Sequence, residues 1–326
     1  MNKPRLSGQL AEAICREFPH APSIQLARVL CKDNPAVFLT VEDARSAVRY
    51  QRGATGEQAR IKIERVGRLV ERLDLPDPEP SHFKVYTLPP EPHRWLVLAD
   101  LHVPFHEPEA VRIALRYGKK AKCDGLLFLG DLCDFYQLSH WLKDPRRRDF
   151  VSELDTVEEV ILIAQEYLKP KDTVWKASNH EYRLDRYLMA RAPELFGIKE
   201  FLISDHLQFQ KRNITWVPRG CPIQHHELTI LHGDEWQSGM TSPVNPARTA
   251  FLKALSCTLT GHQHRTSEHN EPTVTGVNIA CFSVGCLCNL HQEYAPLNKW
   301  NHGGAILDVS DKWHIQNFRI INGTIV

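Results

Sequence analysis

The chain has 326 residues, of which 42% are apolar and 24% charged, which excludes a largely disordered protein and fits one large globular domain with a small one. A formal net charge of +1 excludes the strong overall positive charge of a dedicated nucleic-acid-binding protein, so any such affinity has to come from a local patch. There is no run of about 18 apolar residues and no apolar signal core, so we expect no membrane contact and a cytoplasmic location.

Residues 1–55 are predicted to form a small all-α domain. Apolar residues at helical spacing, interrupted by Pro-containing turns, predict three short helices, at about 7–18, 23–32 and 41–51. Ser23 and Thr40 are the predicted N-caps of the second and third helices, and Asp43 is the capping-box partner of Thr40. The helix, tight turn and further helix resemble a helix-turn-helix module.

Three arginines, Arg45, Arg49 and Arg52, are expected on one side of the third helix. Residues 1–72 contain 13 Lys or Arg against 8 Asp or Glu, so this end of the chain is locally basic. One interpretation is that these arginines contact DNA or RNA. The alternative is a structural or oligomerising cap whose arginines are solvated.

Residues 56–92 are predicted to connect the two domains. Residues 56–74 read as a charged helix with a narrow apolar stripe, which suggests a homo-oligomer contact. Six prolines between residues 76 and 92 indicate a stiff linker. The second domain is then expected to cover residues 93–326.

The second domain is predicted to be α/β. Its short apolar runs, each ending in polar residues, have the pattern of buried strands: RWLVLAD, GLLFLGD, TVWKASN, ITWVP, LTILHGD and CTLTGH. Two long helical patterns, from about 109 to 121 and from 151 to 168, separate the first three runs, which favours an α/β core. After about residue 214 fewer helices separate the runs, so we expect a mostly antiparallel second half.

Five of these runs end in Asp, Asn or His, and polar groups at the carboxyl ends of strands in α/β sheets converge on one site. The motifs are Asp100-Leu101-His102, Gly130-Asp131, Asn179-His180-Glu181, His232-Gly233 and Gly261-His262-Gln263-His264. Oxygen and imidazole ligands suit Mn, Fe, Zn or Mg, without deciding between them. The set exceeds what one tetrahedral zinc needs, so it predicts two metals that share a carboxylate and bind a phosphate ester between them.

The order D-x-H, G-D-x-x-D, N-H-E, H-G and G-H-x-H resembles the calcineurin-like metallophosphoesterase superfamily over residues of about 93–310. The resemblance implies a four-layer αββα sandwich and two divalent ions, with Mn as the first expectation and Fe, Zn, Mg or Ni as alternatives. It implies Asp100, His102, Asp131 and His264 around one metal, and Asp131, Asn179, His232 and His262 around the other. It also implies His180 as the catalytic histidine and Asp134 as its carboxylate partner.

The expected reaction is hydrolysis of a phosphate ester by a water held between the metals, with His180 stabilising the phosphoryl oxygens or protonating the leaving group. The expected substrate is a nucleic acid or nucleotide, for a nuclease, phosphodiesterase or end phosphatase. A protein or small-molecule phosphomonoesterase is the alternative, and a DNA-binding or scaffold protein with this fold is a third reading. One departure from the family pattern is Ser178, where glycine is common before N-H-E.

Candidate substrate contacts follow two of the ligand motifs. Tyr136 and Trp141 have the spacing of one helix face and are able to stack on a base, or else they pack on the domain surface. Arg183 and Arg186 would steer an anionic substrate, or else they pair with neighbouring carboxylates. The segment 281–304 is either a rim over the site or packed C-terminal structure.

Overall fold

The structure, a computed structural model, describes residues 6–53, 61, 73, 75, 77–79, 83–144, 146, 149–236 and 244–326. The chain divides into two compact units, Met1–Ser81 and His82–Val326. Nearly all of the predicted helix at 56–74 lies outside the described residues, so oligomerisation through it stays a prediction. Among the described residues, no helix has both the length and the apolar character needed to cross a membrane.

The described part of the first unit contains three helices, α1 (Leu6–Glu17), α2 (Ser23–Asp33) and α3 (Val41–Gln51). They bury a common core of small and branched side chains, which includes Ala11, Leu26, Leu30, Ala44 and Val48. These helices agree with the predicted ranges to within one residue at each end.

The predicted caps of α2 and α3 differ in outcome. Thr40 Oγ1 accepts a hydrogen bond from the Asp43 amide at 3.1 Å, and Asp43 Oδ2 accepts one from the Thr40 amide at 3.0 Å, so the capping box is confirmed. Ser23 is not a cap. The α2 cap position is Pro22, whose side chain has no acceptor, and the Ser23 hydroxyl instead accepts from the Arg52 guanidinium at 3.2 Å.

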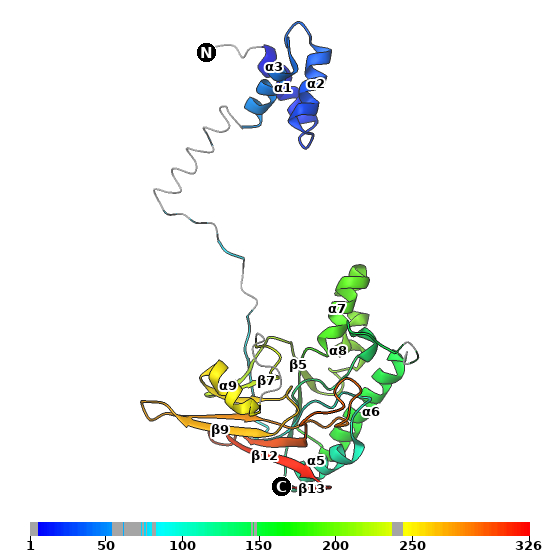
Figure 1. The fold of residues 1–326 in the computed structure, drawn as a ribbon, viewed down its shortest axis with the longest axis vertical. Helices are drawn as coiled ribbons and strands as arrows, with labels where there is room; N and C mark the ends of the chain where they lie inside the picture. The colour runs from blue at the N-terminus through cyan, green and yellow to red at the C-terminus, as the bar shows by residue number, and fades with distance from the viewer. Residues whose placement is uncertain are drawn as a thin grey trace. The chain divides into compact units, whose positions relative to one another are not determined.

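The second unit is a mixed α/β structure with two sheets (Figure 1). The seven-stranded sheet has the order β13 (Thr324–Ile325), β12 (His314–Ile321), β11 (His302–Asp308), β2 (Arg94–Leu98), β3 (Gly125–Phe128), β4 (Asp172–Lys176) and β5 (Ile214–Val217). The six-stranded sheet has the order β1 (Tyr86–Thr87), β6 (Ile223–His225), β7 (Leu228–Leu231), β8 (Cys257–Thr260), β10 (Asn278–Ser283) and β9 (Ser267–Pro272). Strands and helices alternate in sequence through the first half of this unit, as predicted for an α/β core.

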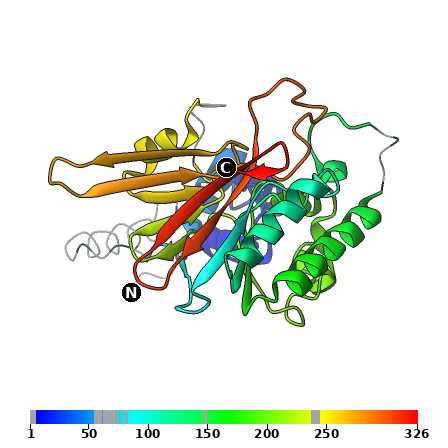
Figure 2. The same ribbon diagram turned by 90° about the horizontal axis from the view of Figure 1, so that it is seen from below.

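The helices of this unit are α5 (Pro108–Lys120), η1 (Tyr136–Leu138), α6 (Phe150–Leu168), α7 (Tyr182–Arg191), η2 (Pro193–Leu195), η3 (Lys199–Phe201), α8 (Ile203–His206) and α9 (Pro246–Ala254). Alternate residues of β2 enter two different cores. Leu96 and Leu98 pack with residues of α5 and α6, whereas Trp95 and Val97 pack with residues of the six-stranded sheet. Figure 2 accordingly shows α5 and α6 on the opposite side of the seven-stranded sheet from β9 and β10.

The expected mostly antiparallel second half is found for most of the pairings between strands after residue 214. β6 pairs antiparallel with β7, β9 with β10, and β12 with both β11 and β13. The exceptions are β7 with β8 and β8 with β10, which are parallel, and the chain crosses over through α9 between β7 and β8. In the seven-stranded sheet β2, β3 and β4 are parallel, so polar residues follow the carboxyl ends of several strands at one edge.

Candidate active site

The backbone is left-handed at most of the predicted ligands. Five of them have φ between 49° and 67°: Asp100, His102, Asp131, His262 and His264. Left-handed backbone at residues other than glycine costs about 1–3 kcal/mol each and persists where surrounding contacts enforce it, commonly at functional sites. The segment Asp100–His102 is therefore not extended, and one ligand atom of Asp100 still lies within 4.8 Å of one of His102.

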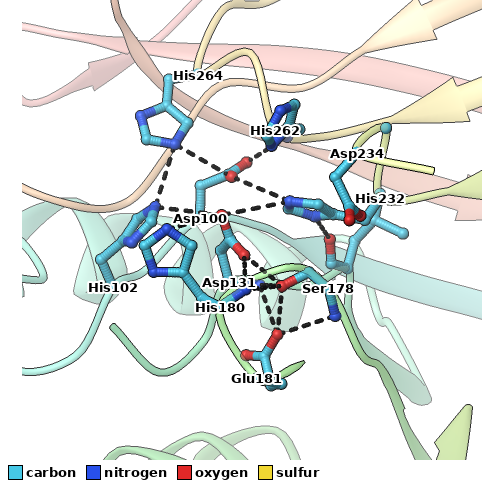
Figure 3. Close-up of polar contacts among 12 residues, drawn as sticks. Asp100, His102, Asp131, Ser178, His180, Glu181, His232, Asp234, His262 and His264 are labelled. Atoms are coloured by element: carbon cyan, nitrogen blue, oxygen red, sulfur yellow. Dashed lines mark hydrogen bonds and ion pairs between the residues drawn. The ribbon is translucent and has the colours of Figure 1, made fainter. Parts of the chain in front are cut away.

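The structure brings together the four residues expected around the first metal (Figure 3). Asp100, His102, Asp131 and His264 are buried, and one potential ligand atom from each lies within 4.8 Å of the others. The His264 Nε2 atom is 3.2 Å from Asp100 Oδ1 and 3.2 Å from His102 Nε2. Two carboxylates and two imidazoles at this spacing form a candidate metal site.

A second group shares one member with the first. Asp131, His232 and His262 also place one ligand atom each within 4.8 Å of one another, and His232 Nε2 is 3.3 Å from Asp131 Oδ2. Asp131 therefore stands where a bridging carboxylate is expected. Asn179, the remaining predicted ligand, keeps its Oδ1 atom buried and without a hydrogen-bond partner.

Hydrogen bonds on the outer side of the imidazoles orient their inner nitrogens. His102 Nδ1 lies 3.0 Å from Asp134 Oδ1, and His232 Nδ1 lies 2.7 Å from the Leu129 carbonyl. A ring that donates from Nδ1 to such an acceptor presents the Nε2 lone pair on the other side, which is the usual arrangement of metal-binding histidine. His264 Nδ1 faces the Cys288 thiol at 3.9 Å.

Several buried polar atoms at the cluster have no hydrogen-bond partner among the described residues: Asp100 Oδ1, Asn179 Oδ1, His232 Nε2, Asp234 Oδ1 and His262 Nδ1. Leaving such atoms unpaired away from water is costly, so each calls for a partner. Four of these atoms belong to predicted ligands. The remaining atom, Asp234 Oδ1, belongs to a residue two positions after His232. Their chemistry and their lack of partners fit a binuclear divalent-metal site.

The electrostatics of the cluster reflect this accumulation of acids and imidazoles. Burial raises the pKa of Asp131, but the charges of His180 and His232 outweigh it and hold this pKa well below its ordinary value. Burial lowers the pKa of His264, but Asp100 outweighs it and raises this pKa to about 10. Asp131 is therefore ionised, as cation binding requires, whereas His264 has to release its proton when a cation binds.

Ser178 and Glu181 form a support that the sequence did not assign. The Glu181 carboxylate accepts hydrogen bonds from the backbone amides of Leu132 at 2.9 Å and Cys133 at 3.2 Å, and from that of Ser178 at 3.0 Å. The Ser178 hydroxyl contacts the carboxylates of both Asp131 and Glu181. The serine that departs from the family pattern thus holds Asp131 in place, and its φ is not left-handed.

His180 and Asp134, the predicted catalytic pair, lie together. His180 Nδ1 is 2.9 Å from the Asp134 carbonyl and 3.3 Å from Asp134 Oδ1. The same carboxylate faces His102, so it orients a candidate ligand and the candidate catalytic histidine at once. Arg183 Nη2 lies 3.0 Å from His180 Nε2, and Nη1 donates to the Asp134 carbonyl at 2.7 Å. Arg183 is thus at the site, and its carboxylate neighbour is Asp134.

A pocket of about 450 Å³ adjoins the cluster. It is lined by Phe105, Asp134, Tyr136, Ser139, Trp141, Leu142, Asn179, His180, Arg183, Gln292, Glu293 and Tyr294. Three predicted substrate contacts, Tyr136, Trp141 and Arg183, are in this lining, and the fourth, Arg186, is exposed and is not. Phe105 was missed, because it belongs to no ligand motif or recognisable spacing, and Tyr294 was covered only by the broader prediction for the segment 281–304.

The predicted helix carrying Tyr136 and Trp141 is wrong. Only Tyr136–Leu138 is helical, as a short 3-10 turn. The Ser139 hydroxyl then accepts from the Trp141 amide at 3.2 Å, and the Tyr136 hydroxyl accepts from the Asp144 amide at 2.7 Å. Side chains thus take amide groups that a helix would have used, and the chain continues as a loop.

The segment 281–304 combines the two structures that the sequence left open, a packed C-terminal segment and a rim over the site. Cys286, Leu287 and Cys288 are fully buried, whereas Gln292, Glu293 and Tyr294 line the pocket. The Trp300 ring packs on His264 with ring centroids 4.1 Å apart. The segment is therefore packed structure at its start and a rim of the pocket further on.

The arginines of α3 have different environments. The Arg52 guanidinium donates to the carbonyls of Phe18 at 3.1 Å and Pro19 at 3.3 Å, as well as to Ser23. Arg45 pairs with Glu42 at 3.3 Å on its own helix, and Arg49 is exposed. Arg52 therefore joins α3 to the α1–α2 turn, and nucleic-acid contact by this surface stays a prediction.

No family model matches the chain. The "Gene 54 protein" of Mycobacterium phage L5 is 24% identical over 238 residues, which are 68% of this chain and 91% of that protein. Among solved structures, a single mutant of Vps29 from Entamoeba histolytica is 12% identical with a TM-score of 0.38, covering 72% of this chain and 96% of that one.

Two further solved structures have similar sequence identities and TM-scores to this chain. The phosphoesterase YfcE from E. coli is 13% identical with a TM-score of 0.32, over 66% of this chain and 88% of its own. A dimetal phosphatase from Danio rerio is 12% identical with a TM-score of 0.36, over 69% of this chain and 95% of its own.

Proposed function

We propose that this protein is a two-metal-dependent phosphoesterase of the calcineurin-like type, acting on a nucleic acid or nucleotide. The observation that carries the proposal is the pair of buried groups that share Asp131, Asp100–His102–Asp131–His264 and Asp131–His232–His262. The unpaired Asn179 Oδ1 atom completes the second group in our assignment. The four-layer αββα sandwich and the helix-turn-helix identity of α1–α3 belong to the same proposal.

Two divalent ions held by these residues would supply Lewis-acid stabilisation of phosphoryl oxygens and increase the acidity of a water between them. The protein contributes a preorganised cradle. Glu181 and Ser178 fix the Asp131 loop through hydrogen bonds to its amides and carboxylate. Ligands that are already oriented need no rearrangement during the reaction, which is the main source of electrostatic catalysis.

His180 is assigned as the residue that meets the phosphoryl or leaving oxygen. Its ring is buried, lines the pocket, and is held at Nδ1 by Asp134, so Nε2 is directed away from that support. Arg183 beside Nε2 limits its movement and adds positive charge next to the position of the phosphate. In this assignment Asp134 is a positioning residue for both His180 and His102.

The test is hydrolysis by metal-stripped, full-length protein resupplied with Mn²⁺, using bis-(p-nitrophenyl) phosphate beside p-nitrophenyl phosphate. We expect metal-dependent turnover of the diester, absent without the ion and absent in Asp131→Asn. His314→Ala, which changes an exposed histidine on β12, is the matched control and should keep full activity.

Each outcome has a distinct meaning. Turnover of the monoester alone would replace the diesterase assignment with a phosphomonoesterase. Full activity in Asp131→Asn would contradict the shared-ligand arrangement. No metal binding by the wild-type protein, measured by elemental analysis after dialysis, would remove the proposal altogether.

A further inference from the structure

Most of the large side chains that line the pocket beside His180 are aromatic rings. Its large side chains are Phe105, Tyr136, Trp141 and Tyr294, with Leu142 at the same wall. We propose that this pocket binds one unpaired nucleobase of a substrate whose phosphate lies at the ligand cluster. The proposal rests on the proposed function, because it names the group that is attached to the scissile phosphate.

Two of the rings are held in place, and a third is exposed beside them. Phe105 and Tyr136 meet edge to face with centroids 6.1 Å apart, and the Tyr136 hydroxyl is fixed by the Asp144 amide. Trp141 is 70% exposed and Leu142 fully exposed, so apolar surface borders a concave site instead of being buried in the core. Stacking of a base on such a ring contributes about 1–3 kcal/mol.

The described lining of the pocket carries no excess of positive charge. Among the lining residues that the structure describes, Arg183 is the cation other than histidine, and its guanidinium is directed to the Asp134 carbonyl and to His180. Asp134 and Glu293 bring two carboxylates to the same lining. With cations held at the ligand cluster, the anionic part of a substrate is drawn there, and the pocket suits its uncharged part.

Polar groups and size distinguish a base from a simple phenyl ring. Ser139 and Gln292 also belong to the lining. The Ser139 hydroxyl accepts from the Trp141 amide and the Gln292 amide nitrogen donates to the Phe105 carbonyl at 3.4 Å, which leaves the hydroxyl hydrogen and the Gln292 carbonyl for the ring nitrogens and exocyclic groups of a base. A volume of about 450 Å³ is within the range of pockets for whole small molecules. A base that enters it has left its pairing partner, so single-stranded or terminal nucleotides are the expected substrates.

The experiment compares a single-stranded thymidine dinucleotide with the same phosphodiester lacking both bases, using metal-loaded, full-length protein. We expect removal of the bases to lower kcat/KM about tenfold or more in the wild type. In Trp141→Ala the two substrates should differ by less than about threefold. Phe196→Ala, which removes a half-exposed ring outside the pocket, should behave as the wild type.

A binding measurement separates this proposal from the proposed function, because adenosine has no phosphate to hydrolyse. Saturable binding of adenosine but not of ribose in a calorimetric titration, weakened in Trp141→Ala and unchanged in Phe196→Ala, supports the pocket even if no diester is turned over. Equal kcat/KM for the two dinucleotides together with no adenosine binding would overturn it. Phenol binding as tightly as adenosine would also overturn it, in favour of a site for a phenyl ring.

Discussion

At the scale of single residues, the site combines groups with three kinds of task. In the proposed function Asp100, Asp131 and the imidazoles offer atoms to cations; Glu181 and Ser178 hold the loop that carries Asp131, and His180 lines the pocket. The sequence motifs propose the first and third kinds by residue type and order. Glu181 belongs to the N-H-E motif, but nothing in its spacing reveals that it accepts backbone amides of the Asp131 loop.

His180→Asn should separate chemistry from metal binding. The side chain is outside both shared-Asp131 groups, so we expect metal content and melting temperature to stay close to the wild type while kcat falls by about 10²–10⁴. Elemental analysis and diester kinetics on the same preparation measure the two quantities. Loss of metal in parallel with activity would instead make His180 a ligand.

Glu153 gives a prediction for the pH dependence of stability. Burial raises its pKa from 4.5 to about 8, and its carboxylate accepts from the Phe135 amide. Between these values the folded protein keeps a proton that the unfolded chain has released, so this residue lowers stability as pH rises from 4.5 to 8. Below pH 4.5 the carboxyl is protonated in both the folded and the unfolded chain, so none of this stability is lost there.

Glu153→Gln keeps an oxygen acceptor and cannot ionise. Its melting temperature relative to the wild type should therefore increase from pH 5 to pH 8.5, by more than about 4 °C. Thermal unfolding at the two pH values measures this. A difference that is the same at both pH values would show that Glu153 does not titrate in this interval.

At the scale of elements, an ion pair connects the two sheets below the cluster. Lys176, the last residue of β4, is completely buried, and its Nζ lies 2.8 Å from Glu235 Oε1 and 2.9 Å from the Ala177 carbonyl. Glu235 in turn accepts from the Gly233 amide at 2.7 Å. The pair therefore joins the segment that leads to Asn179 with the segment that carries His232.

Lys176→Met should leave the buried Glu235 carboxylate without its ion-pair partner. The free energy of unfolding should then fall by about 3–5 kcal/mol. The double variant Lys176→Met with Glu235→Gln removes both charges and should recover much of that stability. If the pair positions ligands, the double variant will still bind Mn²⁺ more weakly than the wild type in a calorimetric titration. Recovery of wild-type affinity would limit the pair to a structural role.

At the scale of the whole molecule, the two units have separate cores. The α1–α3 core contains no residue after Val48, and the two cores of the second unit begin at Leu88. A protein that starts at residue 83 keeps β1 and every candidate site residue except Arg45, Arg49 and Arg52. We expect it to hydrolyse bis-(p-nitrophenyl) phosphate within about twofold of the full chain, since a unit with its own hydrophobic core is expected to fold alone.

The same truncation tests the role of the first unit. If α1–α3 contact nucleic acid, removing them will weaken binding of an oligonucleotide and reduce the salt dependence of that binding. Oligonucleotide affinity at two salt concentrations measures this. Unchanged affinity and salt dependence would leave a structural or oligomerising role for these helices.

The sequence alone determined the α/β class of the second unit, the helices α1–α3 and the identity of the candidate ligands. This was possible because apolar periodicity and strand-end polar residues are local signals, readable within a few residues. The residues that gather around Asp131 were named correctly as neighbours, since parallel strands end at a common edge. Their chemical roles are still to be measured.

Only the tertiary structure decided the left-handed turns at the ligands, the parallel pairing of β7, β8 and β10, and the pocket wall formed by Phe105 and Tyr294. Phe105 and Tyr294 are far apart in the chain, and no local pattern relates them. The loop after Tyr136 was misread as a helix because side-chain hydroxyls captured its amides, a competition that spacing does not reveal. Contacts of this kind depend on where the chain returns to itself, and only the folded molecule establishes that.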